Sequence, residues 1–251
     1  MEENRYLKKY GQNFLNNDYI SNVIVNSLSF NGQKILEIGP GDGALTEKLI
    51  EKDCDLTCVE IDRLYFEKLK QKFPNLNVLN INALKAEFNE YDAIIGNIPY
   101  NITSSLLVKI GTLSYKAEEI VFMTQKEAYE RIVECKTKEE RCAVSILLAT
   151  KYTYKRIINV SKDNFVPKPK VDSTVFKLML RKDSKIENYR DYYEFLLLIF
   201  NSKRKTILNN LIKKYNKEDV IKVLENNNLS ATLRPEDLST EDMVKIYLDL
   251  K

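Results

Sequence analysis

The chain has 251 residues, of which 44% are hydrophobic and 30% charged, and its formal net charge is +3. This is the composition of an ordinary soluble globular protein, long enough for one large domain or for a large and a small one. No stretch approaches the roughly 18 consecutive apolar residues of a membrane span, so we expect no membrane partner.

Strand-like and helix-like segments alternate in the first half of the chain. The N-terminus, MEENRYLKKYGQ, lacks the apolar segment of a secretion signal, so we expect a cytoplasmic location. Helices are predicted at 20–28, up to about 52, up to about 73 and near 104–112, between strands at 34–39, 55–61, 77–81, 91–96 and 118–123. This alternation predicts an α/β fold whose mostly parallel sheet carries helices on both faces.

The pattern changes after about residue 180. Helical periodicity is found at 192–200, 204–214, 218–227 and 241–250. We therefore predict an α/β domain over residues 1–182, followed by a small C-terminal all-helical domain over residues 183–251.

A glycine loop and an acidic residue predict a cofactor site. The segment LEIGPGDGALTEKL (36–49) places Gly39, Gly41 and Gly43 between a strand and a helix, where the backbone can approach a ligand closely. Glu60 ends the next strand, where a carboxylate can bind both hydroxyls of a ribose. Loop and acid indicate a nucleoside-containing cofactor, without separating a dinucleotide from S-adenosylmethionine.

The segment Asn97-Ile98-Pro99-Tyr100 follows the strand at 91–96, at the edge of the sheet where α/β proteins bind ligands. Its structural alternative is an Asn-initiated turn. In the functional interpretation, the Asn97 oxygen and the Ile98 carbonyl accept both N–H bonds of a nucleobase amine and free its lone pair. Pro99 stiffens the segment and Tyr100 offers a ring face to the base.

The residue types restrict the chemistry further. The chain has no histidine, which excludes Ser-His-Asp and Cys-His catalysis and every His-ligated metal site. Its four cysteines, at 54, 58, 135 and 142, lack the CxxC pairing of a zinc site, so we expect buried thiols and no metal.

Two segments are strongly basic. Residues 151–182 carry nine Lys/Arg and two Asp/Glu, and residues 200–217 carry six Lys/Arg and no acid. A single basic run is usually a solvated face. Two of them on an otherwise acidic chain favour a surface that binds a polyanion.

Seven motifs in order resemble those of the rRNA adenine N6-dimethyltransferases, specifically the KsgA-type small-subunit enzymes, which are related to the Erm resistance methyltransferases. The motifs are KKYGQNFL (8–15), LEIGPGDGALT (36–46), VEID (59–62), GNIPYNIT (96–103), NFVPKPKVDS (164–173), FNSKRKTI (200–207) and LRPEDLS (233–239). The resemblance covers nearly the whole chain. It implies a Rossmann-like methyltransferase catalytic domain and a helical domain that recognises rRNA.

The resemblance also implies the cofactor, S-adenosyl-L-methionine, and residues that bind it. Asn13 and Leu15 close over the cofactor, Gly39 and the glycine loop with Gly41 lie against it, and Glu60 holds its ribose. Asn82 stands where the family usually has an aspartate that accepts from the cofactor's adenine amine. An uncharged acceptor implies a modestly weaker grip on the cofactor.

On the substrate side, the resemblance implies that Asn97 and Tyr100 act on the target adenine, with Asn97 also beside the cofactor. Phe165 is similar to the aromatic residue that helps to sandwich the flipped base; the structural alternative is a simple core residue. The expected substrate is a pair of adjacent adenosines in small-subunit rRNA, presented by a pre-ribosomal small subunit to a monomeric enzyme.

Basic residues of both segments are expected to bind rRNA phosphates, namely Lys168, Lys170, Lys203, Arg204 and Lys205. The last three stand where the family's F-x-x-R-R-K run has R-R-K, with a lysine in place of one arginine. This exchange keeps the charge but loses a bidentate phosphate contact.

Three alternatives remain at this point. An Erm-like enzyme acting on large-subunit rRNA has the same cofactor site, and only LRPEDLS and the Lys-Arg-Lys run favour the small-subunit enzyme. A non-catalytic RNA- or DNA-binding assembly or transcription factor would not need an intact Asn97–Tyr100 segment. A nicotinamide dehydrogenase would more often have G-x-G-x-x-G, and here the third glycine comes one residue early.

Overall fold

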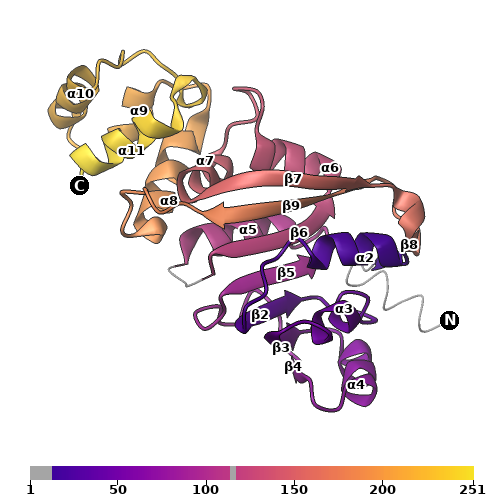
Figure 1. Ribbon diagram of the computed structural model, residues 1–251. Coiled ribbons are helices and arrows are strands. Elements are labelled where there is room, and N and C mark those ends of the chain that lie inside the picture. The colour runs from indigo at the N-terminus through magenta and orange to yellow at the C-terminus, as the bar shows by residue number, and fades with distance from the viewer. Residues whose placement is uncertain (1–12, 114–116) are drawn as a thin grey trace. The chain divides into compact units, whose positions relative to one another are not determined.

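The computed structural model describes residues 13–113 and 117–251, which form two compact units (Figure 1). Unit 1 takes in the described residues of Met1–Leu106, Tyr115–Tyr129 and Thr153–Leu180, and unit 2 those of Leu107–Ser114, Glu130–Tyr152 and Arg181–Lys251. The start of the motif KKYGQNFL, residues 8–12, lies outside the described residues.

Unit 1 is built on a seven-stranded sheet with the order β4-β3-β2-β5-β6-β9-β7 (Figure 1). The strands are β2 (Gln33–Ile38), β3 (Cys54–Val59), β4 (Asn77–Leu79), β5 (Ala93–Asn97), β6 (Glu119–Gln125), β7 (Tyr152–Val160) and β9 (Ser173–Leu180). The pairs β2–β3, β3–β4, β2–β5 and β5–β6 are parallel, whereas β9 runs antiparallel to β6. The predicted mostly parallel α/β fold is confirmed.

Strands β7 and β9 are the elements of unit 1 that the sequence patterns missed. They occupy the segment that we interpreted only as a basic run. Lysine and arginine stand among their apolar residues and interrupt a clear alternation, as in the sequence YKRIINV at the end of β7. The antiparallel edge of the sheet was therefore not predictable from periodicity.

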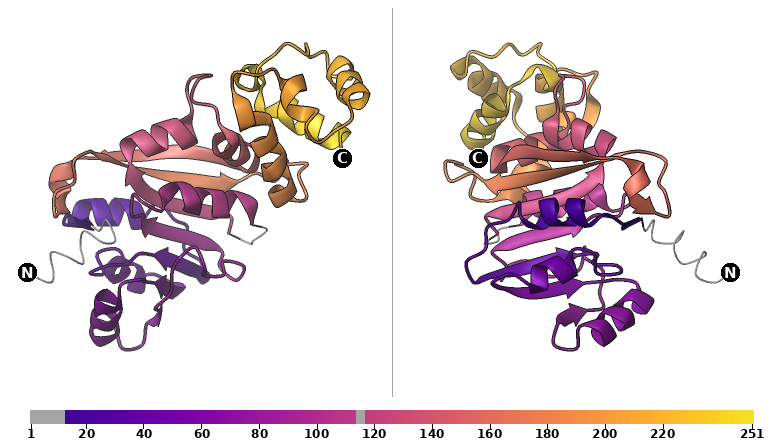
Figure 2. Two further views of the ribbon diagram at one scale, coloured as in Figure 1. Left: turned by 180° about the vertical axis from the view of Figure 1, so that it is seen from behind. Right: turned by 45° about the vertical axis from the view of Figure 1, so that its right-hand side comes forward.

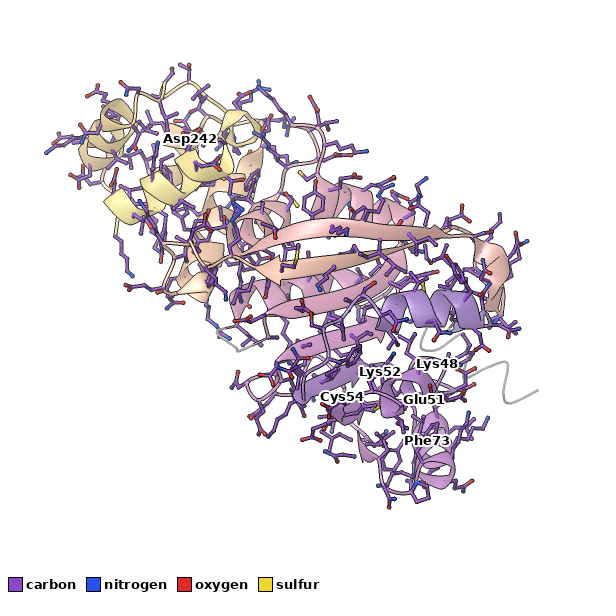
Figure 3. The ribbon with its side chains drawn as sticks, viewed as in Figure 1. Lys48, Glu51, Lys52, Cys54, Phe73 and Asp242 are labelled. Atoms are coloured by element: carbon purple, nitrogen blue, oxygen red, sulfur yellow. The ribbon has the colours of Figure 1, made fainter. Side chains whose placement is uncertain are left out.

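The helices that accompany the sheet are α2 (Asp18–Val25), α3 (Thr46–Ile50), α4 (Arg63–Lys72), α5 (Thr103–Thr112) and α6 (Lys126–Tyr129). Side-chain caps mark two of the helix starts: Asn17 accepts from the Ile20 N–H, and Asp62 accepts from the Leu64 N–H. Lys48, labelled in Figure 3, forms an ion pair of 3.5 Å with Asp18 in the first turn of α2.

Alternate residues of the central strands share one core with α2, α3 and α4. Ile35 of β2, Ile95 of β5 and Val121 of β6 pack there with Ile24 of α2 and Leu49 of α3. The intervening strand residues, such as Ile94 and Phe122, are buried on the opposite face. A sheet that is apolar on both faces explains why these strands appear as continuous apolar runs in the sequence.

A two-stranded sheet joins the N-terminal segment to a loop far along the chain. Strand β1 (Phe14–Leu15) pairs antiparallel with β8 (Phe165–Val166), which follows the 3-10 helix η2 (Lys162–Asn164). Both views of Figure 2 show α2, which begins three residues after β1, beside the loop that carries β8. This pairing attaches β1 to the loop that carries β8, within unit 1.

Unit 2 is helical. After the π-helix η1 (Glu130–Glu134) it contains the helices α7 (Ala143–Lys151), α8 (Tyr189–Ile199), α9 (Ile207–Leu211), α10 (Lys217–Asn226) and α11 (Thr240–Asp249), with short 3-10 helices η3 (Phe200–Ser202) and η4 (Pro235–Asp237). Its core includes Leu147, Tyr192, Leu224 and Ile246. Asp242, labelled in Figure 3, accepts from the Ser239 N–H and hydroxyl and so caps α11.

The helical segments predicted after residue 190 correspond to α8, α9, α10 and α11. Unit 2 begins at Arg181 in this part of the chain, beside the predicted division at 182/183, but it also takes in η1 and α7. The division into domains at 182/183 stays a prediction.

Gly96 is the residue that lets β5 lie against the end of β2. A Cβ atom at this position would lie 2.4 Å from the Ile38 carbonyl oxygen and 3.0 Å from the Ile98 side chain. A backbone oxygen in a paired sheet cannot move away, so only glycine fits here. The strand order also reverses at this place, because β3 lies on one side of β2 and β5 on the other.

We expect Gly96→Ala to lower the free energy of unfolding by about 3 kcal/mol, because the added methyl overpacks an inter-strand contact. Urea denaturation measures this change. Gly32→Ala is the matched control: nothing lies within 4 Å of its Cβ position, and only its φ of +66° should cost about 1 kcal/mol. Equal losses in the two variants would mean that the Ile38 contact is not the cause.

Candidate active site

A cavity of about 310 Å³ lies at the carboxyl ends of β2, β3 and β5. Its wall is formed by segments 13–15, 37–42, 44–45, 59–61, 82–83 and 97–102. The volume is at the lower end of the range of small-molecule sites. All seven residues predicted to bind the cofactor lie in this wall, namely Asn13, Leu15, Gly39, Gly41, Glu60, Asn82 and Asn97.

The glycine loop, which connects β2 to α3, lines the cavity. Gly41 has φ +57°, a conformation that favours glycine, and its N–H donates to Glu60 Oε2 over 3.1 Å. A Cβ at Gly41 would stand 2.8 Å from the Phe14 ring. Glycine is therefore required here both by the turn and by the close approach of the N-terminal segment.

The carboxylate of Glu60 is buried at the end of β3. Besides the Gly41 N–H, it accepts from the Asp62 N–H at 2.8 Å. Burial raises the pKa of Glu60 to about 6, and the two backbone donors oppose that shift. Each oxygen keeps a lone pair beyond its backbone contact, so the group can accept two further hydrogen bonds from the hydroxyls of a ribose.

Glu37 is a site residue that we did not predict. It is 1% exposed, lines the cavity, and its Oε2 accepts from the Thr46 hydroxyl at 2.7 Å and the Cys58 thiol at 3.4 Å. Burial raises its pKa to about 7. An acid in the apolar strand KILEI was the available signal, since such a residue is rarely buried without a reason.

Asn82 lines the cavity from the loop after β4. Its side-chain oxygen accepts from the Leu84 N–H at 2.8 Å, and its carbonyl accepts from the Lys85 and Ala86 N–H groups. The oxygen expected to accept from an adenine amine thus already stabilises the loop. A single lone pair remains for a ligand, in keeping with the prediction of a weaker grip.

The Asn97–Tyr100 segment lines the same cavity as Glu60, at the end of β5. The Ile98 N–H donates to the Met123 carbonyl at 2.9 Å, which fixes the peptide, and the Ile98 side chain is buried. The Tyr100 hydroxyl lies 3.3 Å from the Ser173 hydroxyl, and burial raises the pKa of Tyr100. The Asn97 Nδ2 donates to the Asn13 carbonyl at 3.0 Å.

Phe165 is placed differently from the other predicted catalytic residues. Its side chain is 3% exposed and belongs to the core that includes Leu15, its partner in the β1–β8 pair. It does not contribute to the described wall of the cavity. Its predicted contact with a flipped base stays a prediction and requires the ring to become uncovered.

The two basic segments differ in the structure. In 200–217 the side chains of Lys203, Arg204 and Lys205 are exposed, with the Lys203 Nζ donating to the Glu139 carbonyl at 3.0 Å. In the other segment, Lys168 forms an ion pair with Asp163, and Lys170 is exposed.

Several other cations of residues 151–182 are used inside the fold. Lys151 is 2% exposed and donates to the Ile110 carbonyl at 2.9 Å, while Lys177 donates to Glu119 at 2.7 Å. Arg156 lies 5.0 Å from the centre of the Tyr129 ring. Fewer cations of this segment are therefore available to an RNA than its count of Lys and Arg suggests.

Comparison with known proteins identifies the family. The sequence matches the ribosomal RNA adenine dimethylase family over residues 3–251. The chain belongs to this family. The ribosomal RNA small subunit methyltransferase A of Malacoplasma penetrans is 38% identical over 249 residues, which cover 96% of this chain and 91% of that protein. Its namesake from Mycoplasmopsis pulmonis is 36% identical and covered in full, over 98% of this chain.

A dimethyladenosine transferase and an rRNA methyltransferase of known structure have the same fold. A dimethyladenosine transferase from Plasmodium falciparum superposes with a TM-score of 0.82 at 26% identity, over 94% of this chain and 96% of that one. The 23S rRNA methyltransferase ErmE gives a TM-score of 0.72 at 25% identity, over 95% and 99%. The predicted Rossmann-like methyltransferase fold and the prediction of an rRNA adenine dimethyltransferase are confirmed.

The cavity fits the methyl donor that a dimethylase requires. The glycine cradle admits a ligand close to the backbone, and Glu60 offers a buried carboxylate for ribose hydroxyls. Within residues 13–113 and 117–251, no group of three or more His, Cys, Asp or Glu could hold a metal ion. In the same part of the chain, no helix is long and apolar enough to cross a membrane.

We expect S-adenosylhomocysteine binding to this dimethylase to weaken about tenfold per pH unit below pH 6, because a protonated Glu60 no longer accepts two hydroxyl hydrogen bonds. The pKa of Glu60 is raised, so the loss begins near its folded value of about 6 rather than at the ordinary value of 4.5. Isothermal titration calorimetry between pH 5 and pH 8 measures the dissociation constant.

Glu60→Gln is the control for this prediction. It should bind more weakly at pH 8 and lose the dependence below pH 6. Glu37→Gln separates the contribution of the second buried carboxyl, whose pKa is about 7. An unchanged pH dependence in Glu60→Gln would show that another group controls binding.

Proposed function

We propose that this chain dimethylates N6 of two adjacent adenosines in small-subunit rRNA during ribosome biogenesis, with S-adenosyl-L-methionine as the methyl donor. The observation that carries the proposal is the position of Asn97 and Ile98. They line the same cavity as Glu60 and the glycine loop, so an amine held by them would face the bound cofactor.

The cofactor contacts follow from the wall of the cavity. Glu60 would accept from the ribose hydroxyls, Gly39 and Gly41 would lie along the cofactor, and the Asn13–Leu15 segment would cover it. When bound, S-adenosylmethionine supplies an activated methyl group on a sulfonium. No histidine, metal or covalent enzyme intermediate is then needed.

The residues after β5 would prepare the nucleophile. An exocyclic adenine amine is a weak nucleophile because its lone pair is delocalised into the ring. If the Asn97 oxygen and the Ile98 carbonyl accept its two N–H bonds, the nitrogen moves towards tetrahedral geometry and its lone pair becomes available. The proton displaced by methylation passes to water, and the second methylation repeats the arrangement with the remaining N–H.

Tyr100 and Pro99 would hold the target base. Pro99 restricts the backbone directly after the Ile98 carbonyl, and its own carbonyl accepts from the Thr103 hydroxyl at 3.3 Å, which ties the segment to the start of α5. The Tyr100 ring is half-buried beside the cavity. A base that has left its stack can pack against such a ring.

Exposed cations would bind the rRNA backbone. Six of them lie within residues 200–217: Lys203, Arg204, Lys205, Lys213, Lys214 and Lys217. Contacts to phosphates position the substrate without reading its sequence. The small-subunit names of the relatives support this substrate. The proposal includes a cytoplasmic enzyme that acts as a monomer on a pre-ribosomal particle.

Methyl transfer from radiolabelled S-adenosylmethionine to defined ribosomal particles tests the proposal. We expect two methyl groups on each of two adenosines in undermethylated small subunits. Because ErmE shares the fold, naked large-subunit rRNA is the second substrate to assay. Transfer only to the large-subunit rRNA would replace the proposal with an Erm-like activity, and no transfer to either would refute both.

We expect Asn97→Ala to reduce methyl transfer by at least about 100-fold, because one of the two acceptors for the amine is lost. Calorimetric binding of S-adenosylhomocysteine should stay nearly unchanged. Asn89→Ala, an exposed residue of the same unit, is the control. Parallel loss of transfer and cofactor binding would mean that Asn97 is structural.

We expect Arg204→Ala with Lys205→Ala to weaken binding to small-subunit rRNA and to reduce the slope of log K against log salt by about 1.8, since two phosphate contacts disappear. Filter binding between 50 and 200 mM salt measures the slope. Lys245→Ala on α11, exposed among acidic neighbours, should leave it unchanged. An unaltered slope in the double variant would remove these residues from the RNA contact.

A further inference from the structure

Residues 13–17, here called the strap, connect two parts of unit 1. On one side, Phe14 and Leu15 pair with Val166 and Phe165 in the β1–β8 sheet. The Asn16 N–H donates to the Asn164 carbonyl at 2.8 Å, and the Asn17 side chain donates to that of Asn164 at 2.7 Å. The strap is therefore held along its length by η2 and β8.

On its other side, the strap lies on the glycine loop. The Phe14 ring packs against Tyr65 of α4, with 4.8 Å between the ring centres, and sits where a Cβ at Gly41 would be. Asn13, Phe14 and Leu15 all line the cavity. The strap is thus a wall of the cavity that the Phe14 ring fastens in place.

The strap also contacts the residue proposed to activate the amine. The Asn13 carbonyl accepts a hydrogen bond from the Asn97 side chain at 3.0 Å. A carbonyl oxygen can only accept, so the amide nitrogen of Asn97 must face the strap. The amide oxygen then points away from the strap, and a flip of the side chain by 180° would break the contact.

We propose that the strap is a positioning element for methyl transfer. By holding the Asn97 nitrogen on the Asn13 carbonyl, it presents the Asn97 oxygen as an acceptor to the target amine. Asn97 is correctly oriented only while the strap lies across the glycine loop. This inference rests on the role proposed for Asn97 and adds the group that orients it.

The two orientations of the amide have nearly the same shape but opposite chemistry. The flipped amide would turn an N–H towards the target amine, which itself donates N–H groups. One neutral hydrogen bond separates the two orientations, so its loss changes their ratio by about fivefold to tenfold. With the two orientations then equally populated, the correctly oriented fraction falls from about 0.9 to about 0.5, so the maximal rate should fall about twofold when the strap is loosened.

Phe14→Ala in the full chain tests the proposal, because it removes the ring that fastens the strap without changing Asn97. We expect kcat at saturating cofactor and rRNA to fall about twofold. In ¹⁵N-labelled protein without ligands, we also expect faster hydrogen exchange of the Asn97 side-chain amide. The Asn97→Asp variant identifies that signal by its absence.

A second pair of variants acts from the other side of the ring contact. Tyr65→Ala should reproduce both effects, whereas Tyr65→Phe keeps the ring and should leave both at the wild-type value. Tyr19→Ala, which removes a 69% exposed ring from α2, is the control for aromatic loss near the strap. Thermal unfolding of each variant identifies any global loss of stability.

The readouts separate this inference from the proposed function. Unchanged exchange of the Asn97 amide in Phe14→Ala and Tyr65→Ala would overturn the role of the strap, whatever happens to kcat. Full transfer activity in Asn97→Ala would instead overturn the proposed role of Asn97, even if its amide responds to the strap.

Discussion

Strands β2 and β5 approach each other at their carboxyl ends more closely than residues with a Cβ would permit, because Gly96 faces the Ile38 carbonyl. β2 leads into the glycine loop, and β5 leads into Asn97 and Ile98. The glycine loop and the two proposed acceptors for the amine therefore face one cavity. Alignment within such a cavity is the main source of rate for a donor that is already activated.

The cavity was largely predictable because its signals are local. Glycines after a strand, an acid at the next strand end and the Asn97–Tyr100 segment each lie at the carboxyl end of a parallel strand, and the topology of the sheet brings such ends together. The Phe14 contact with Tyr65 was not predictable, since it joins residues 51 positions apart and leaves no periodic pattern. The burial of Phe165 depends in the same way on pairing with Leu15.

The charge of a segment did not predict whether its cations are exposed; their position in the fold decides it. Lys151 and Lys177 belong to a run of nine cations, yet one is buried against backbone carbonyls and the other paired with a carboxylate. The same density at 200–217 lies at an exposed turn between η3 and α9 and continues beyond that short helix. Sequence alone could not distinguish these cases, because Lys151 is hidden at the end of helix α7 and Lys177 in strand β9, whereas a turn hides few residues.

The strap has a consequence for the order of events at one adenosine. Dimethylation consumes two molecules of the methyl donor, and the strap forms part of the wall of the cavity in which, on our proposal, each is exchanged. A strap that moved away from the cavity would release the Asn97 amide from the Asn13 carbonyl. If Asn97 binds the amine as proposed, the half-modified adenosine would be held least firmly while the spent cofactor leaves. Whether the same adenosine receives its second methyl before the enzyme departs is then decided by contacts outside the strap, and by how fast a fresh donor arrives.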